Sequence, residues 1–242
     1  MIQRLIACAA ALCVGLAAAP AAAQEPDVVR VVLVGDSTIA TNSGYGNALC
    51  GLFQWQVECV NFARNGRSTK SYRDDGSWDG VMAMLRGPSR ARETWVLIQF
   101  GHNDQASRTV RTDLATEFPA NLARFVEEVR AAGARPVLVT PLARRQFADG
   151  ALKEDLADWA EATRRVAREQ RVPLVDLYRE SVAAVKRMGP AEADTLARPQ
   201  GRGFDRTHLG AKGAAFFAGI VAKELAAAVP ELGERLVVPG DL

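Results

Sequence analysis

Short apolar runs rich in β-branched residues recur along the chain, and stretches with helical spacing of apolar residues lie between and after them. Five runs predict buried strands: Val28–Gly35, Val57–Ala63, Thr94–Phe100, Pro136–Thr140 and Val172–Leu177. Strands that alternate with helices form βαβ units, and the runs show no hairpin turns between them. Near-continuous apolar strands are typical of a sheet covered on both faces. We therefore predict an α/β fold, a three-layer α/β/α sandwich around a parallel sheet of about five strands.

Four stretches predict the main helices: Asp113–Ala132, Leu152–Gln170, Leu177–Met188 and Ala211–Ala228. In the first, Pro119 indicates either a kink or a later start, because proline lacks the N–H that a helix interior needs. No repeat and no linker interrupts the pattern. Residues 24–242 are therefore expected to form a single domain.

The first 23 residues are typical of a secretory signal peptide. Arg4 supplies a positive charge, Leu5–Ala23 is uncharged and mostly apolar, and Ala21–Ala22–Ala23 is a cleavage site of the A-x-A kind. An uncleaved membrane anchor is the alternative. With cleavage, we expect a secreted or periplasmic protein without membrane attachment.

Cleavage would remove two of the four cysteines and leave Cys50 and Cys59. A pair of cysteines in an exported chain favours a disulfide, because the compartment is oxidising. Two buried free thiols are the alternative.

Charge and histidine content exclude some functions. Lys and Arg total 30 against 28 Asp and Glu, a formal net charge of +2, which gives no electrostatic case for binding nucleic acid. The chain has two histidines, so a three-histidine metal site is impossible. Any histidine-based catalysis must use His102 or His208.

Polar motifs follow three of the predicted strands, and another precedes the last helix. They are GDST at 35–38, NGRS at 65–68, GHND at 101–104 and DRTH at 205–208. Sites in such folds lie beyond the carboxyl ends of the strands. A serine hydroxyl, a glycine N–H, an amide donor and an Asp–His pair are the groups that acyl transfer needs. Singly, each has a simpler interpretation: a capping serine, a turn glycine, an Asx turn and a surface histidine.

In this order and spacing, the four motifs resemble the four blocks of the SGNH (GDSL-type) hydrolases, which implies their flavodoxin-like α/β/α fold. Longer strings are similar to rhamnogalacturonan acetylesterases: RNGRSTKSY at 64–72, IQFGHNDQ at 98–105, PVLVTPLARR at 136–145 and DRTHL at 205–209. The resemblance covers residues 28–229. Thr38 stands where many relatives have Leu, which matches the acetylesterase branch.

The resemblance implies a role for each matching residue. Ser37 is the nucleophile, His208 is the general base and then the general acid, and Asp205 orients His208. The backbone N–H groups of Ser37 and Gly66, with the side chain of Asn103, form the oxyanion hole. This mechanism needs no metal and no cofactor.

Residues near the motifs are candidates for substrate contact: Arg67, Tyr72, Trp78 and His102. Trp78 is equally explained as the apolar anchor of the next helix, and His102 as a group that supports the site. Arginines concentrate on the predicted site loops, which suits an acidic polysaccharide such as pectin. Alternatively, the chain uses Arg in place of Lys throughout. The loop arginines are Arg64, Arg67, Arg73, Arg108, Arg111, Arg144, Arg145, Arg198, Arg202 and Arg206.

Together these features predict an exported, monomeric serine esterase that removes O-acetyl groups from plant cell-wall polysaccharide, rhamnogalacturonan or pectin. One alternative is a lipase or thioesterase of the same superfamily. Another is an acetylesterase acting on a different glycan, xylan or peptidoglycan. A non-catalytic carbohydrate-binding protein on the same scaffold is a third.

Overall fold

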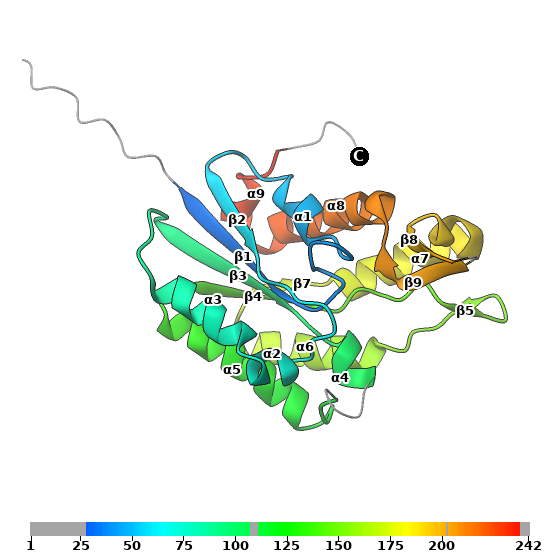
Figure 1. The fold of residues 1–242 in the computed structure, drawn as a ribbon, viewed down its shortest axis with the longest axis horizontal. Helices are drawn as coiled ribbons and strands as arrows, with labels where there is room; N and C mark the ends of the chain where they lie inside the picture. The colour runs from blue at the N-terminus through cyan, green and yellow to red at the C-terminus, as the bar shows by residue number, and fades with distance from the viewer. Residues whose placement is uncertain (1–27, 107–110, 202, 238–242) are drawn as a thin grey trace, which may run out of the picture.

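The structure is a computed structural model, and it describes residues 28–106, 111–201 and 203–237. The predicted signal peptide lies outside the described residues. The centre is a five-stranded sheet in the order β2-β1-β3-β4-β7, and every neighbouring pair is parallel (Figure 1). Its strands are β1 (Val29–Gly35), β2 (Val57–Asn61), β3 (Glu93–Gln99), β4 (Arg135–Val139) and β7 (Leu174–Val175). The predicted five-stranded parallel sheet is confirmed.

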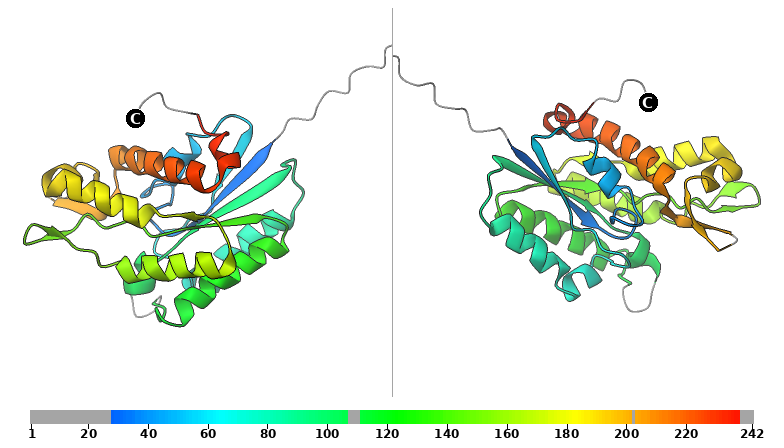
Figure 2. Two further views of the ribbon diagram at one scale, coloured as in Figure 1. Left: turned by 180° about the vertical axis from the view of Figure 1, so that it is seen from behind. Right: turned by 45° about the horizontal axis from the view of Figure 1, so that its top comes forward.

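Helices cover both faces of the sheet (Figures 1 and 2). One face carries α2 (Ser71–Asp74), α3 (Ser77–Arg86), α5 (Glu117–Ala131) and α6 (Ala157–Gln170). The other carries α1 (Gly46–Cys50), α7 (Leu177–Asp194), α8 (Ala211–Ala228) and α9 (Pro230–Gly233). The short helix α4 (His102–Ala106) directly follows β3. The three-layer α/β/α sandwich is therefore also as predicted.

Strand β1 divides its side chains between the two cores. Val31 and Leu33 pack on the side of α8, whereas Val32 and Val34 pack on the side of α5, and all four are fully buried. Successive residues of a strand point to opposite faces, so one continuous apolar run supplies both cores. Full burial of such a side chain contributes about 1.5–3 kcal/mol.

Strand β7 is shorter than the predicted run 172–177. Only Leu174 and Val175 pair with β4. Pro173 has no N–H to donate, and Asp176 leaves the sheet to cap α7, where its side chain accepts from Arg179 N. The strand therefore ends as soon as the next helix begins.

The ends of two helices can be compared with the prediction. Helix α5 begins at Glu117, so Pro119 lies in its first turn and the later start is correct. The helical geometry of α7 breaks at Gly189, with φ 72° and ψ 175°, so its first part ends at Met188 as predicted, and a second helical part then reaches Asp194.

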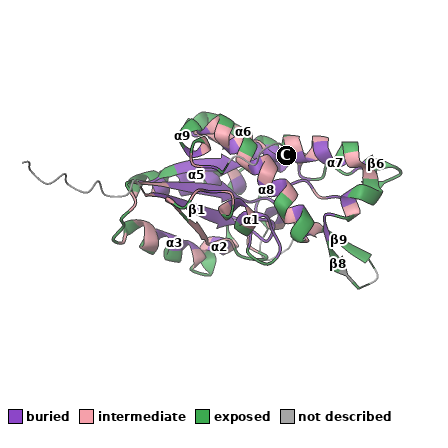
Figure 3. Cartoon of the chain, turned by 90° about the horizontal axis from the view of Figure 1, so that it is seen from above, coloured by how far each residue is buried: buried purple, intermediate pink, exposed green. Residues whose placement is uncertain are grey.

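Two antiparallel hairpins lie outside the main sheet and were not predicted, whereas every pairing within that sheet is parallel, as expected. The first pairs β5 (Phe147–Ala148) with β6 (Ala151–Leu152), and the second pairs β8 (Ala197–Gln200) with β9 (Gly203–Leu209). The second hairpin projects from the body of the molecule (Figure 3). The first has a sequence signal, because Asp149–Gly150 takes the two positive φ angles of a tight hairpin turn.

Among the described residues, none of the helices combines the length and the apolar character needed to cross a bilayer.

A disulfide joins Cys50, the last residue of α1, to Cys59 in β2, with their Cα atoms 5.4 Å apart. The structure thus contains the expected bridge rather than two free thiols. It ties α1 to β2, which pairs with β1 at the edge of the sheet.

Replacing both cysteines, Cys50→Ala with Cys59→Ala, is expected to lower the free energy of unfolding by about 2–3 kcal/mol. The physical reason is that the unfolded chain gains the conformational freedom that a short closed loop removes. Urea denaturation of the oxidised protein and the double variant measures the difference. A reducing agent should destabilise the unmodified protein equally and leave the variant unchanged. Equal stability of the two proteins without reductant would contradict the prediction.

Candidate active site

Ser37 lies just beyond the carboxyl end of β1, with 6% of its surface exposed. Gly35 ends the strand in close contact with β3, since a Cβ at this position would lie 2.4 Å from the carbonyl oxygen of Gln99. Only glycine permits so close an approach of two backbones. The serine is therefore presented at the edge of the sheet from a tightly held strand end.

Ser37, His208 and Asp205 form a continuous hydrogen-bonded chain. The Nε2 atom of His208 lies 2.7 Å from Oγ of Ser37, and its Nδ1 atom lies 2.6 Å from Oδ2 of Asp205. A carboxylate on one ring nitrogen leaves the other nitrogen facing the serine hydroxyl, which is the arrangement a base–nucleophile pair requires. The fold thus brings together residues 171 positions apart in the chain.

The second carboxylate oxygen of Asp205 is also bound. Oδ1 accepts from the backbone N–H groups of Thr207 and His208, each at 3.0 Å. Burial raises the pKa of Asp205, but the hydrogen bonds and the charge of His208, with the N–H of Thr207, more than offset this and lower it below its usual value. Asp205 is therefore held ionised and oriented. It lies on β9, the strand that precedes α8.

A buried polar network fixes the loop that carries Ser37. Thr38 donates through its backbone N–H and its hydroxyl to Oδ1 of Asp36, both at 2.8 Å. The side-chain amide of Gln99 donates to the Thr38 hydroxyl at 2.6 Å and accepts from the Tyr45 hydroxyl, also at 2.6 Å. A leucine at position 38 would remove this hydroxyl, so the departure from the commonest family motif has a structural use.

His102 is buried beside Asp36, a residue of the serine loop. Its ring is 3% exposed, and Nδ1 is 3.5 Å from Oδ2 of Asp36, too long for a strong hydrogen bond. Burial raises the pKa of Asp36, but His102 and the two donors of Thr38 outweigh it and lower the pKa. This burial against Asp36 fits the interpretation of His102 as a group that supports the site better than it fits a substrate contact.

Three potential oxyanion donors follow three neighbouring strands. Ser37 comes after β1, Gly66 after β2 and Asn103 after β3, and the order of these strands in the sheet is β2-β1-β3. Gly66 has φ 73°, which favours glycine, and a Cβ at this position would meet no atom within 4 Å. Nδ2 of Asn103 donates one hydrogen to the carbonyl of Arg67 at 3.0 Å, which leaves its second hydrogen free to face a ligand. No hydrogen bond between described residues uses the backbone N–H of Ser37 or Gly66.

Asp104, which the sequence analysis did not single out, connects two of these loops. It is fully buried and accepts from the backbone N–H of Thr69 at 3.0 Å, from the Thr69 hydroxyl at 2.5 Å and from the Thr112 hydroxyl at 2.9 Å. Burial raises its pKa to about 6, although these hydrogen bonds act in the opposite direction. Its position next to Asn103 in the GHND motif is the sequence signal that could have identified it.

Tyr72 and Trp78 do not reach the surface, so the prediction that they contact substrate is wrong. Tyr72 is fully buried, and its hydroxyl donates to the carbonyl of Phe62 at 2.7 Å. Trp78 is 3% exposed, packs edge-on against Phe125 and donates its indole N–H to Glu128. Both aromatic rings belong to the core under α3 and α5, which agrees with the alternative interpretation of Trp78.

Half of the eight described arginines of the site loops are paired within the protein, whereas Arg64, Arg111 and Arg198 are exposed. Arg108 and Arg202 lie outside the described residues, and Arg145 is fully buried. Four others form ion pairs: Arg67 with Asp75, Arg73 with Glu128, Arg144 with Asp155 and Arg206 with Asp194. Arg67 keeps 37% of its side chain exposed despite its pair. The number of arginines therefore overstates the positive charge available to an acidic substrate.

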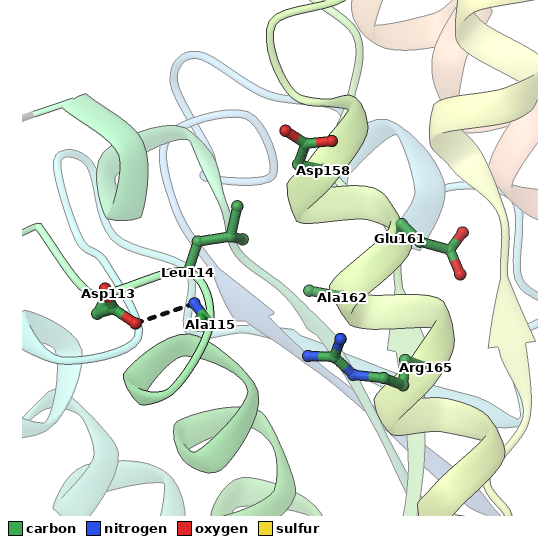
Figure 4. Close-up of a pocket in the computed structure, with 7 residues that line it drawn as sticks. All are labelled: Asp113, Leu114, Ala115, Asp158, Glu161, Ala162 and Arg165. Carbon is green, nitrogen blue, oxygen red and sulfur yellow. Dashed lines mark hydrogen bonds between the residues drawn. The ribbon is translucent and has the colours of Figure 1, made fainter.

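Two hollows of the described surface contain none of the predicted site residues. An open pocket of about 370 Å³ lies between the loop before α5 and helix α6, lined by Asp113, Leu114 and Arg165 among others (Figure 4). A larger apolar groove of about 670 Å³ lies along α7, α8 and α9. No cluster of three or more potential metal ligands occurs in the described parts of the chain.

The buried Asp104 should make stability depend on pH. Its pKa is about 6 in the fold against an ordinary value of 3.8, so the folded state binds the proton more tightly. This contribution is complete below about pH 4 and is lost as the pH rises through about 6. Between pH 4 and 7, the free energy of unfolding should fall relative to that of Asp104→Asn, by an amount on the order of 3 kcal/mol. Urea denaturation of both proteins across this range measures it, and parallel curves would contradict it.

Comparison with known proteins places this geometry in a family. Residues 33–216 match the model of the GDSL-like Lipase/Acylhydrolase family. A Bacillus subtilis protein named Probable rhamnogalacturonan acetylesterase YesY is 29% identical over 212 residues, which cover 84% of this chain and 94% of that protein. Rhamnogalacturonan acetylesterase RhgT of the same organism is 31% identical over 223 residues, which cover 85% of this chain and 91% of that protein.

The fold also matches solved structures. A mutant of an acetyl-xylooligosaccharide esterase from Geobacillus Stearmophilus superimposes with a TM-score of 0.63 at 20% identity, over 84% of this chain and 96% of that one. The likeness concerns the fold alone. With the family model matching most of the chain, the conclusion is that the chain belongs to the GDSL-like lipase/acylhydrolase family of ester hydrolases.

Proposed function

We propose that the protein is a serine esterase that removes O-acetyl groups from plant cell-wall polysaccharide, with rhamnogalacturonan as the substrate. The observation that carries the chemistry is the hydrogen-bonded chain from Ser37 through His208 to Asp205. The proposal for the substrate rests on the two Bacillus subtilis relatives, whose names state this activity.

In the first half of the reaction, Oγ of Ser37 attacks the acetyl carbonyl carbon and Nε2 of His208 takes the hydroxyl proton. The negative oxygen of the tetrahedral intermediate accepts from the N–H groups of Ser37 and Gly66 and from the amide of Asn103. The bond to the sugar oxygen then breaks. The sugar alcohol leaves with the proton from His208, and the acetyl group remains on Ser37.

In the second half, a water molecule attacks the acetyl carbonyl and His208 takes its proton. The same three donors hold the second tetrahedral intermediate. Its collapse releases acetate and returns the proton to Oγ of Ser37. Throughout, the ionised Asp205 stabilises the positive charge on His208 and keeps its ring in place.

A long-chain lipase or thioesterase is less well supported. Such an enzyme needs an apolar channel for the acyl chain next to the nucleophile. Polar groups surround the backbone of Ser37: the Ser43 hydroxyl lies 2.6 Å from the carbonyl of Ser37 and 2.9 Å from the side-chain oxygen of Asn65. The apolar groove along α7 and α8 contains none of the triad residues.

We also propose that residues 1–23 direct export and are then removed, so that the enzyme meets its polymer outside the cytoplasm. The charge, the apolar stretch and the alanine-rich cleavage site support this. Amino-terminal sequencing of the protein recovered from the periplasm or medium of its host tests this proposal.

Ser37→Ala should lower the hydrolysis of 4-nitrophenyl acetate by a factor of about 10⁴ or more, because the acetyl group then has no covalent acceptor. Ser89→Ala, in the loop before β3 at the opposite end of the sheet, is the matched control and should keep full activity. Initial rates at saturating ester measure both. An active Ser37→Ala variant would exclude the mechanism.

The substrate is tested by acetate release from acetylated rhamnogalacturonan, xylan and peptidoglycan at equal acetyl concentration. We expect rhamnogalacturonan to give a kcat/KM at least about tenfold above the other two, since discrimination of this size needs only about 1.4 kcal/mol of differential transition-state binding. A preference for xylan or peptidoglycan would overturn the proposed substrate and leave the mechanism in place. Tight binding of a polymer with no acetate release from any of them would instead indicate a carbohydrate-binding protein.

A further inference from the structure

Arg145 is among the largest fully buried side chains of the described residues. It follows β4 by six residues, in a loop at the carboxyl edge of the sheet. Moving a guanidinium out of water is costly unless its charge and its N–H groups find partners. The partners of Arg145 therefore indicate what this burial achieves.

All the hydrogen bonds of Arg145 go to the strand that carries the acid and the base. Its Nη2 atom donates to the carbonyl of His208 at 2.6 Å and to the carbonyl of Asp205 at 3.2 Å. Its backbone N–H donates to the carbonyl of Arg206 at 2.9 Å. One residue thus holds three carbonyls within the Asp205–His208 segment.

No other function for the guanidinium is visible among the described residues. Among the described residues, no carboxylate lies within ion-pair distance of the Arg145 guanidinium. Its Nε and Nη1 atoms donate to no group of these residues. Burial lowers the pKa of Arg145 to about 10, and the nearby Asp205 and Asp194 limit that fall. The side chain is therefore charged at neutral pH, and charged donors make the stronger hydrogen bonds to carbonyls.

The segment needs such an anchor because β9 lies outside the main sheet. Its ladder partner is β8, and the register of this pair is irregular between Ala197 and Arg198. One backbone bond, from Leu209 N to the carbonyl of Ser43 at 2.9 Å, ties the end of β9 to the serine loop. Without a further constraint, the distance from His208 to Ser37 would depend on a projecting hairpin.

We propose that Arg145 is a positioning residue. Its guanidinium binds the backbone carbonyls of Asp205 and His208 from the interior of the protein and so holds both residues in place relative to Ser37. This inference rests on the proposed serine mechanism. The side chain touches neither substrate nor reacting atoms, so its removal should lower kcat and leave KM nearly unchanged. A displacement of about 1 Å at a reacting group is enough to lower a rate about 10²-fold.

Arg130 provides a matched control. Its Nη2 atom also donates to two backbone carbonyls, those of Gln170 at 2.7 Å and Arg171 at 3.2 Å, but near the carboxyl end of α5, which leads into the start of β4. Arg130→Met removes the same kind of contact far from the triad. Arg145→Met keeps the length of the side chain without a donor, and Arg145→Lys restores a charged donor.

The experiment measures kcat and KM for 4-nitrophenyl acetate, with circular dichroism to confirm folding. We expect kcat of Arg145→Met to fall about 10²-fold with KM within about twofold, and Arg145→Lys to recover at least about tenfold. Arg130→Met should stay within about twofold of the unmodified enzyme. Should Arg145→Met not fold, Arg145→Gln, which keeps a neutral donor, replaces it under the same criteria.

Three results would overturn the proposal. They are a folded Arg145→Met with unchanged kcat, a Lys variant as impaired as the Met variant, and a failure of both the Met and the Gln variants to fold, which would make the role purely structural. Failure of the proposed function would look different. The unmodified enzyme would then be inactive, or Ser37→Ala would remain active, whatever the Arg145 variants show.

Discussion

Parallel pairing of β1 with β2 on one side and with β3 on the other is the constraint on which the site depends. Val29 lies opposite both Val57 and Glu93, and from there the pairing continues residue by residue along both ladders. β1 and β3 also end side by side, at Gly35 and Gln99, and β2 ends two residues earlier, opposite Leu33. The loops after the three strands therefore emerge at one edge, and Ser37, Gly66 and Asn103 come from that edge although they are separated by tens of residues.

The other two residues of the proposed triad are held at this edge in a different way. Asp205 and His208 lie on a hairpin outside the sheet, so no ladder with β1 sets their position. Interior polar contacts do this instead: Ser43 binds the end of the hairpin, and Arg145 binds its carbonyls. Hydrogen bonds suit the task because they are directional and because buried donors left without partners are costly.

Much of the fold and of the candidate site follows from local pattern. The apolar runs predict the five parallel strands, and the helix Ala211–Ala228 has the bounds expected from its spacing. Errors occur where the same pattern has two physical meanings. The sequence suggests Tyr72 and Trp78 as substrate contacts, but an aromatic residue close to a site motif in the sequence is as readily part of the core. The loop arginines look like a cationic surface, whereas ion pairs form between segments that the sequence does not show to be neighbours.

By itself, the sequence determined the layer architecture, the cysteine pair and the choice of Ser37, Gly66, Asn103, Asp205 and His208 as site candidates, because these depend on periodicity, on local motifs or on the family resemblance that the motifs carry. Only the tertiary structure decided that Arg145 and Asp104 are buried beside these motifs and that His102 is buried against Asp36. It also decided that the Asp205–His208 segment is part of a hairpin strand. These features depend on which distant segments pack together. Burial converts an ordinary arginine or aspartate into an anchor, and no local pattern records burial of that kind.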